Sequence, residues 1–278
     1  MVILDGKALA EKIYSELREE ISKSAKKYRL AVILVGENAV TEKFVEKKKK
    51  IGEHIGIDVR VYHFPESISA TELRKRIAEI VHEEKNSGVI IQLPLPAHIE
   101  KQSILNAVVP EKDVDVLSAR AVGNFSVGKS RAAPTVVGAI QELFREYKID
   151  VKGKTIAILG AGALVGKPVA MWLMRESSAV TVITEETPNP EEILQKADII
   201  ISGIGKPGYI TGDMVKEGVI VVDAGTSESE GKIRGDVDFD SVSKKASYIT
   251  PVPGGVGPLT VALIFKNLLA LALHKFPK

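Results

Sequence analysis

Short, largely apolar segments alternate with longer amphipathic segments along most of this sequence. The expected strands are residues 30–35, 58–63, 89–91, 155–159, 180–183, 198–201 and 219–222. Helical spacing of apolar residues occurs in residues 7–26, 41–55, 70–84, 136–147, 164–176 and 190–197, and a last helix is expected near Pro258. Apolar strands separated by helices predict a parallel sheet that is covered on both faces. The predicted fold class is therefore α/β.

The chain has 278 residues, which is enough for two compact domains. Residues 110–134 are irregular and rich in small residues, so we interpret this segment as a domain junction. We expect two α/β domains, each with a parallel sheet flanked by helices, and the second of them Rossmann-like.

The composition excludes several kinds of site. Without cysteine there are no disulfides, thiolate metal sites or cysteine nucleophile, and the five histidines lack metal-ligand spacing, so we expect no metal. A net charge of +2 is too balanced for a nucleic-acid surface. The longest apolar run, residues 261–273, is interrupted by Lys266 and Asn267 and is too short to span a bilayer. Residues 1–10 do not resemble a signal peptide, so a cytoplasmic protein is expected.

A glycine-rich turn follows the expected strand at residues 155–159 and opens an expected helix. Gly160, Gly162 and Gly166 permit a tight turn and let backbone N–H groups approach a pyrophosphate. Their spacing is one residue longer than the commonest dinucleotide-binding pattern. An ordinary glycine-rich turn is the alternative, but the flanking strand and helix favour a dinucleotide site.

The next expected strand ends at Thr184, Glu185 and Glu186. A carboxylate at this place typically accepts a ribose hydroxyl of NAD and repels a 2′-phosphate. A solvated strand end explains the same residues equally well, so both interpretations stay open.

A run of lysines spans residues 47–50, and helical geometry separates its members. Lys48 falls on one stripe with Phe44, Ile51 and Ile55, whereas Lys49 and Lys50 point away from that stripe. A lysine on a core-facing side tends to have a lowered pKa, as catalytic lysines do. The alternative is a lysine whose ammonium extends to solvent along that face.

Three further segments suit a ligand crevice. Gln92 is the first polar residue after the strand at 89–91, where parallel strands line such a crevice, although it also suits a strand cap. Asp113 and Asp115 lie in the junction, where turn chemistry is the alternative. Glycines and prolines make residues 250–260 a stiff loop that permits close backbone approach, either to a planar ligand or as a rigid connector.

Several motifs carry a family resemblance. They are Gly-Val-Ile-Ile-Gln-Leu-Pro-Leu-Pro at 88–96, Pro-Glu-Lys-Asp-Val-Asp at 110–115, Ala-Asp through Gly-Lys-Pro at 197–207, Gly-Asp-Val at 235–237 and Pro-Val-Pro-Gly-Gly-Val-Gly-Pro at 251–258. With them the chain resembles the bifunctional methylenetetrahydrofolate dehydrogenase/cyclohydrolase family over nearly its whole length. The first and last motifs are highly specific in combination.

The resemblance implies roles for individual residues. Lys48 matches the catalytic lysine, Gln92 its glutamine partner and Asp115 the aspartate that binds the pterin. The expected substrate-binding residues are Phe44, Gln92, Leu93, Pro94, Asp115, Pro253, Gly254 and Gly255. The expected cofactor-binding residues are Gly160, Ala161, Gly162, Val165, Gly166, Glu185, Gly203 and Thr226.

The resemblance also implies the organisation of the molecule. Residues 1–117 and 258–278 are expected to form the folate-binding catalytic domain, and residues 118–257 the dinucleotide-binding Rossmann domain. The active site is expected in the cleft between them, and the chains are expected to form a homodimer.

The chain departs from the family pattern at several positions. Phe44 replaces a usual tyrosine, and Val116 replaces the glycine that usually follows Asp-Val-Asp. Ala161 and Glu185 fall within segments that usually read Gly-Arg-Ser and His-Ser, which supply the family's 2′-phosphate contacts. The expected cofactor is therefore NADP, the family default, with NAD as the alternative.

The function that the resemblance implies is oxidation of 5,10-methylenetetrahydrofolate to methenyltetrahydrofolate, followed by hydrolysis to 10-formyltetrahydrofolate. Lys48 is expected to be neutral for part of the cycle, because an ammonium would repel the cationic methenyl group. Two alternatives stay open. One is a dehydrogenase that lacks the hydrolytic step, because Phe44 has no hydroxyl, and the other is a non-catalytic regulator that binds dinucleotide or folate.

Overall fold

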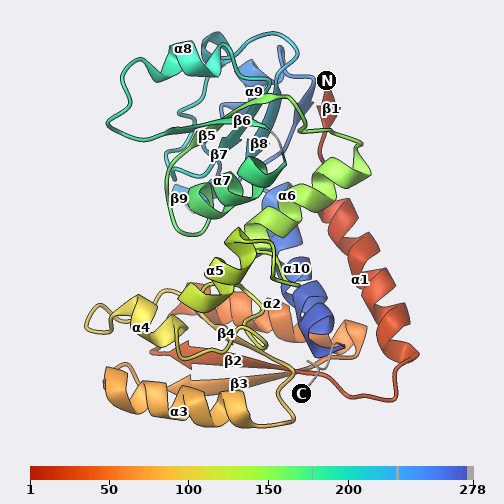
Figure 1. The fold of residues 1–278 in the computed structure, drawn as a ribbon, viewed down its shortest axis with the longest axis vertical. Helices are drawn as coiled ribbons and strands as arrows, with labels where there is room; N and C mark the ends of the chain where they lie inside the picture. The colour runs from red at the N-terminus through yellow and green to blue at the C-terminus, as the bar shows by residue number, and fades with distance from the viewer. Residues whose placement is uncertain (177, 230–231, 274–278) are drawn as a thin grey trace. The chain divides into compact units, whose positions relative to one another are not determined.

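The computed structural model describes residues 1–176, 178–229 and 232–273, and the chain forms two compact units (Figure 1). Unit 1 comprises Met1–Glu11 and Thr135–Thr260, and unit 2 comprises Lys12–Pro134 and Val261–Lys278. These boundaries differ from the expected ones at 117/118 and 257/258. Strand β1 (Val2–Ile3) pairs with β11 (Tyr248–Ile249), which brings the first residues into unit 1. The side-chain amide of Asn267 donates to the carbonyls of Val114 and Ala133, which keeps the segment before Pro134 in unit 2.

Unit 2 is built on a parallel sheet with the strand order β3-β2-β4. The strands are β2 (Arg29–Val35), β3 (Asp58–Phe64) and β4 (Gly88–Ile91). Helices α3 (Ala70–His82) and α4 (Lys101–Leu105) pack apolar side chains on one face, in a core that includes Ile33, Leu73 and Ile77. Helix α2 (Ala39–Ile55) contacts β3, and a Cβ on Gly52 would overlap with the side chain of Val59, so glycine permits this close approach.

Unit 1 contains a parallel sheet with the strand order β1-β11-β8-β7-β5-β6. Its remaining strands are β5 (Thr155–Leu159), β6 (Ala179–Ile183), β7 (Ile199–Ser202) and β8 (Ile220–Asp223). The chain moves from β5 to β6 on one side and then to β7 on the other, so the winding direction reverses at β5. Ligands of doubly wound sheets bind outside the carboxyl ends of the strands at such a reversal.

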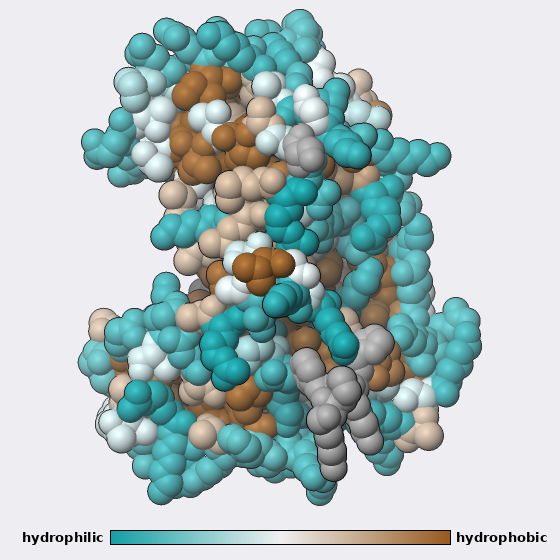
Figure 2. Space-filling view, in the orientation of Figure 1, coloured by the Kyte–Doolittle hydropathy of each residue, from teal (hydrophilic) through white to brown (hydrophobic). Residues whose placement is uncertain are grey.

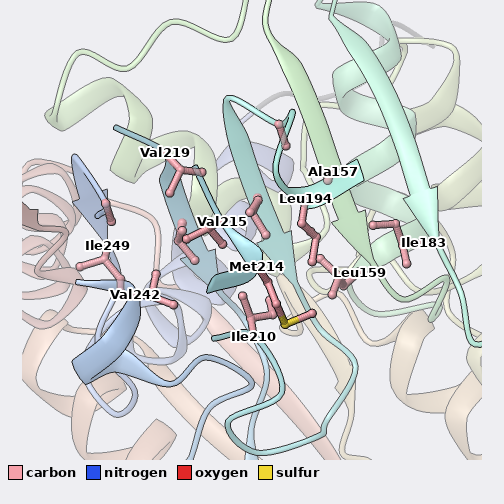
Figure 3. Close-up of a cluster of buried hydrophobic side chains, with 14 residues drawn as sticks. Ala157, Leu159, Ile183, Leu194, Ile210, Met214, Val215, Val219, Val242 and Ile249 are labelled. Carbon is pink, nitrogen blue, oxygen red and sulfur yellow. The ribbon is translucent and has the colours of Figure 1, made fainter. Parts of the chain in front are cut away.

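Helices cover both faces of the sheet in unit 1. Helix α7 (Gly166–Arg175) contacts β5, β6 and α6 (Thr135–Glu146). On the other face, α8 (Pro190–Leu194), the short helix η1 (Gly212–Met214) and α9 (Phe239–Val242) contribute Leu194, Met214 and Val242 to a core with side chains of the strands (Figure 3). The α/β fold class with two parallel sheets flanked by helices is thus confirmed, as is the Rossmann-like character of this unit.

Two long helices each belong to both units, because a unit boundary falls within each of them. They are α1 (Gly6–Ser22) and α10 (Val256–Ala272). The segment 110–134, expected to be irregular, contains helix α5 (Ala119–Ser126). The Ser118 side chain accepts a hydrogen bond from the N–H of Ala121, so a local cap begins this helix. The antiparallel pair of β9 (Ser227–Ser229) and β10 (Lys232–Arg234) was also not anticipated, because strands this short lack a periodic signal.

The visible surface of each unit is mainly hydrophilic, with smaller hydrophobic areas (Figure 2). No helix in the described part of the chain is long and apolar enough to cross a membrane.

Candidate functional site

Lys48 lies on the buried side of α2. Its side chain is 5% exposed, alongside buried Val45 and Ile55, whereas Lys49 and Lys50 are exposed. The orientation inferred from helical spacing is therefore correct for all three lysines. Phe44 is different, because it is 48% exposed and does not belong to the buried stripe. Val45, one position further along, packs inward in its place, since the face that meets the sheet is rotated by one residue.

The ammonium of Lys48 is held by the residue that follows strand β4. Its Nζ donates to Gln92 Oε1 at 2.9 Å. Gln92 Nε2 donates in turn to the carbonyl of Leu93 at 2.9 Å, which fixes the amide with its oxygen toward the lysine. The backbone N–H of Gln92 donates to the carbonyl of Ile33 and extends the pairing of β4 with β2. Two predicted residues, distant in sequence, are thus in direct contact.

The charge of Lys48 is set by its surroundings. Burial lowers the pKa of the Lys48 ammonium, the negative charge of Asp115 opposes that shift, and Lys47 adds to it. A buried lysine with a lowered pKa loses its proton more easily than one in water. Lys48 beside Gln92 and Asp115 is therefore a candidate for taking up and releasing a proton.

Asp113 and Asp115 have different environments. Asp113 is buried, and its Oδ2 accepts hydrogen bonds from the N–H groups of Leu117 and Ser118. Burial raises the pKa of Asp113 to about 6, and these hydrogen bonds oppose the shift. Asp113 thus organises the turn, as the structural alternative proposed, whereas Asp115 acts on Lys48. Val116, within this turn, has a φ of 57°, the left-handed region that glycine adopts with least strain.

The glycine-rich turn in unit 1 is held by its own backbone. Gly160 has a φ of 94°, and a Cβ on Gly166 would overlap with the carbonyl oxygen of Gly160. Gly162 is exposed, and a Cβ built on it would meet no described atom within 4 Å. Gly160 and Gly166 are therefore required by the fold of the turn, whereas the space beside Gly162 is open to a ligand.

The other predicted cofactor residues lie at the same edge of the sheet. Val165 precedes α7, and a Cβ on Gly203 would meet its side chain at 2.6 Å. Glu185 follows β6, Gly203 follows β7 and Thr226 follows β8, and because these strands are parallel their carboxyl ends coincide. The side chain of Val165 does not cap α7. At the start of this helix the N–H of Lys167 donates to the carbonyl of Gly162, and Pro168 has no N–H, so the turn and the helix are held together by backbone contacts.

Two residues at this edge were not assigned a role from the sequence. Lys206 Nζ lies 2.7 Å from Glu185 Oε1. The fully buried carboxylate of Asp236 accepts hydrogen bonds from Ser202 Oγ and from the N–H groups of Ile204 and Lys206. Both residues lie in motifs that carried the family resemblance, and for Lys206 the position after an expected parallel strand was a further signal. Asp236 follows β10, which pairs antiparallel with β9, so the expected strands gave no signal for it.

The proline- and glycine-rich loop belongs to unit 1. Gly254 has a φ of 118° and its carbonyl accepts from the N–H of Lys7, while a Cβ on Gly6 would overlap with the carbonyl of Gly255. These glycines thus allow the loop to pack on the start of α1. Of the predicted substrate-binding residues, Pro253, Gly254 and Gly255 lie in unit 1, and Phe44, Gln92, Leu93, Pro94 and Asp115 lie in unit 2.

The fold and these residues define a class: a two-unit α/β protein with a nucleotide-binding sheet edge in one unit and a buried lysine in the other. Residues 4–115 match the tetrahydrofolate dehydrogenase/cyclohydrolase catalytic domain, and residues 134–276 match the NAD(P)-binding domain of the same family. The chain therefore belongs to the tetrahydrofolate dehydrogenase/cyclohydrolase family.

Individual relatives agree with this assignment. The chain is 43% identical to the Bifunctional protein FolD of Sulfurihydrogenibium sp., over 99% of both chains. It is 45% identical to that of Nautilia profundicola, over 98% of this chain and 97% of the relative. The crystal structure of the bifunctional enzyme FolD from Campylobacter jejuni matches with a TM-score of 0.95 and 42% identity, covering 98% of this chain and 99% of that one. The Trypanosoma brucei enzyme, complexed with NADP cofactor and inhibitor, matches with a TM-score of 0.92 and 34% identity, covering 98% and 97%.

Proposed function

We propose that this protein oxidises 5,10-methylenetetrahydrofolate to methenyltetrahydrofolate with a nicotinamide dinucleotide, and then hydrolyses the product to 10-formyltetrahydrofolate. The observation that carries the proposal is the hydrogen bond from buried Lys48 to Gln92, in a chain that matches both domains of the family. A non-catalytic regulator would not need a desolvated lysine beside a fixed amide oxygen.

Unit 1 has the features that a dinucleotide needs. The open space at Gly162 admits a pyrophosphate, and Gly160, Gly203 and Thr226 border the same edge. When bound, the nicotinamide ring accepts the hydride that leaves the one-carbon bridge of the folate. The protein's task in this unit is to bind and orient the dinucleotide.

Lys48 serves the second step. Loss of hydride leaves a cationic methenyl group, and a neutral amine avoids the repulsion that an ammonium would cause. Burial lowers the pKa of Lys48, and Gln92 Oε1 orients its nitrogen. As water adds to the methenyl carbon, Lys48 accepts the proton that the water loses and returns it when the C–N bond to one ring nitrogen breaks. The products are 10-formyltetrahydrofolate and one proton.

Asp115 has a separate role in the proposal. It is partly exposed in unit 2, and its negative charge reaches Lys48. A carboxylate in that position accepts hydrogen bonds from the amino and ring N–H groups of a pterin. Binding the pterin would thus be coupled to the charge of the lysine.

The finer choices are also part of the proposal. NADP is the preferred dinucleotide, and NAD is accepted because Ala161 and Glu185 carry no positive charge. The protein acts as a homodimer in the cytoplasm.

A specific observation favours one second candidate, a dehydrogenase that lacks the hydrolytic step. Phe44 lies one helical turn before Lys48 and is 48% exposed, so the position is open to a ligand but offers no hydroxyl. If a hydroxyl at this position is needed to position water, only the oxidation remains.

One experiment tests both candidates. Purified protein is mixed with methylenetetrahydrofolate and either NAD or NADP, and reduced dinucleotide is followed by its absorbance. Methenyltetrahydrofolate is supplied separately, and its hydrolysis is followed by loss of its own absorbance. Turnover in both assays supports the bifunctional enzyme, oxidation alone supports the second candidate, and turnover in neither assay contradicts both.

A further inference from the structure

The ion pair between Glu185 and Lys206 joins two strands that are not neighbours. Glu185 follows β6 and Lys206 follows β7, and β5 lies between these strands. The pair therefore crosses the sheet edge at β5, from which the glycine-rich turn Gly160–Gly162 departs. This is the point where the winding direction reverses and where a dinucleotide is expected to bind.

Lys206 is not a loosely placed surface residue. Its backbone N–H donates at 2.9 Å to Asp236 Oδ1, and the same buried carboxylate binds the N–H of Ile204 at 2.8 Å. Ser227 Oγ donates to the carbonyl of Gly205 at 2.9 Å. These hydrogen bonds fix the backbone of Ile204, Gly205 and Lys206. From this fixed backbone the ammonium of Lys206 reaches the carboxylate of Glu185.

The pair has little to do with stability. The side chains of Lys206 and Glu185 are 53% and 80% exposed, and exposed ion pairs contribute little to folding. In doubly wound sheets that bind dinucleotides, a carboxylate after the second strand, here Glu185 after β6, contacts the adenosine ribose. The ion pair brings the ammonium of Lys206 to the same place. Neither Ala161 nor Glu185 can supply a positive charge there, but Lys206 can.

We propose that Lys206 selects the dinucleotide: its ammonium binds the 2′-phosphate of NADP, and Glu185, which holds it in the free protein, accepts the ribose hydroxyls of NAD. The inference rests on the proposed dinucleotide binding. One site thereby contains a group for each cofactor. NADP must displace the carboxylate from the lysine, whereas NAD can bind with the ion pair intact, so the preference for NADP is limited by the carboxylate.

The test measures dissociation constants of NAD and NADP by calorimetric titration of the full-length protein. Lys206→Met should weaken NADP binding by about tenfold or more and change NAD binding by less than about threefold. Glu185→Gln should tighten NADP binding and weaken NAD binding. The NADP effect of Lys206→Met should shrink at high sodium chloride, because salt screens exposed charges.

The same unit offers a matched control. Lys216 pairs with Asp198 at 2.6 Å, but Asp198 precedes β7 and so lies at the amino ends of the strands. Lys216→Met should leave the ratio of the two dissociation constants unchanged. Adenosine 2′,5′-bisphosphate and 5′-AMP, used as competitors, isolate the 2′-phosphate, and only the first should lose affinity for Lys206→Met.

Two results would overturn the inference in distinguishable ways. If the wild-type protein binds dinucleotide but Lys206→Met changes NAD and NADP binding equally, Lys206 does not select the cofactor. If the wild-type protein binds neither dinucleotide, the proposed function itself is wrong, and the inference is lost with it.

Discussion

Lys48 of helix α2 and Gln92, which follows strand β4, form a hydrogen bond of 2.9 Å, and the amide of Gln92 is oriented by Leu93. The lysine is buried, so its nitrogen has little water to compensate for a change of partner. Substitutions of Lys48 and Gln92 therefore test the proposed chemistry most directly.

Replacing Lys48 should remove the hydrolytic step. Lys48→Met keeps an apolar stem in the buried position and removes the titrating nitrogen, so hydrolysis of methenyltetrahydrofolate should fall by on the order of a hundredfold or more. Lys49→Met and Lys50→Met are the matched controls and should be near neutral, because both side chains are exposed. Equal losses in all three variants would show that the orientation of the helix has no bearing on catalysis.

Replacing Gln92 should shift the pH profile. Gln92→Glu puts a carboxylate beside the ammonium, which raises the pKa of Lys48. Because the proposed step needs the neutral amine, the rising limb of the hydrolysis rate should move to higher pH. The measurement is the rate against pH for the wild-type protein and the variant. If the variant has a lower maximal rate but its rate rises over the same pH values as the wild type, the rising limb does not report the titration of Lys48.

Gly162 and Gly166 of the glycine-rich turn should respond differently to substitution. Gly166→Ala should destabilise the fold by roughly 3 kcal/mol or more, because the new methyl group would overlap with a backbone oxygen that cannot move aside. Gly162→Val should fold normally, since no described atom lies near its Cβ, but dinucleotide affinity should fall by about tenfold or more. Thermal unfolding and dinucleotide titration distinguish the two. Unchanged affinity in folded Gly162→Val would argue against this turn as the pyrophosphate site.

Asp113 should make stability depend on pH. Burial raises its pKa to about 6 in the folded protein, so the folded state keeps a proton that the unfolded state has already lost. Stability should therefore decrease as pH rises from about 4 through 6, by on the order of 2–3 kcal/mol. In Asp113→Asn the amide oxygen can accept both N–H groups that now bind Oδ2, and this loss should disappear.

The comparison uses denaturant unfolding of both proteins at mildly acidic and neutral pH. Burial also raises the pKa of Asp223 to about 6. Because Asp223 is present in both proteins, its contribution cancels from the difference between their free energies of unfolding. Parallel stability curves for the two proteins would show that Asp113 is ionised in the fold throughout.

The sequence predicted the positions of Lys48 and Gln92 because each follows from local periodicity. Spacing along a helix separates Lys48 from Lys49, and the end of an apolar strand marks Gln92. Phe44 was misplaced because it and Val45 both lie within one turn of Lys48, and only the neighbouring strand determines which of them is buried. Periodicity defines a stripe to within about one residue, and tertiary packing fixes the rest.

The pair of Glu185 and Lys206 could not be predicted in this way. Its residues meet only because β6 and β7 lie on opposite sides of β5, and strand order is a property of the whole sheet. Similarly, β1 and β11 have two residues each, too few for any pattern, and their pairing moved the first residues of the chain into unit 1.

That pairing of β1 with β11 has a consequence for how the protein is made. Residues 2 and 3 are partners of residues 248 and 249, so the edge of the larger sheet stays open until these residues, far along the chain, have been synthesised. Contacts so distant in sequence form late and slowly. A nascent chain arrested before residue 248 should therefore present β8 as a bare edge strand, a surface that chaperones would have to protect.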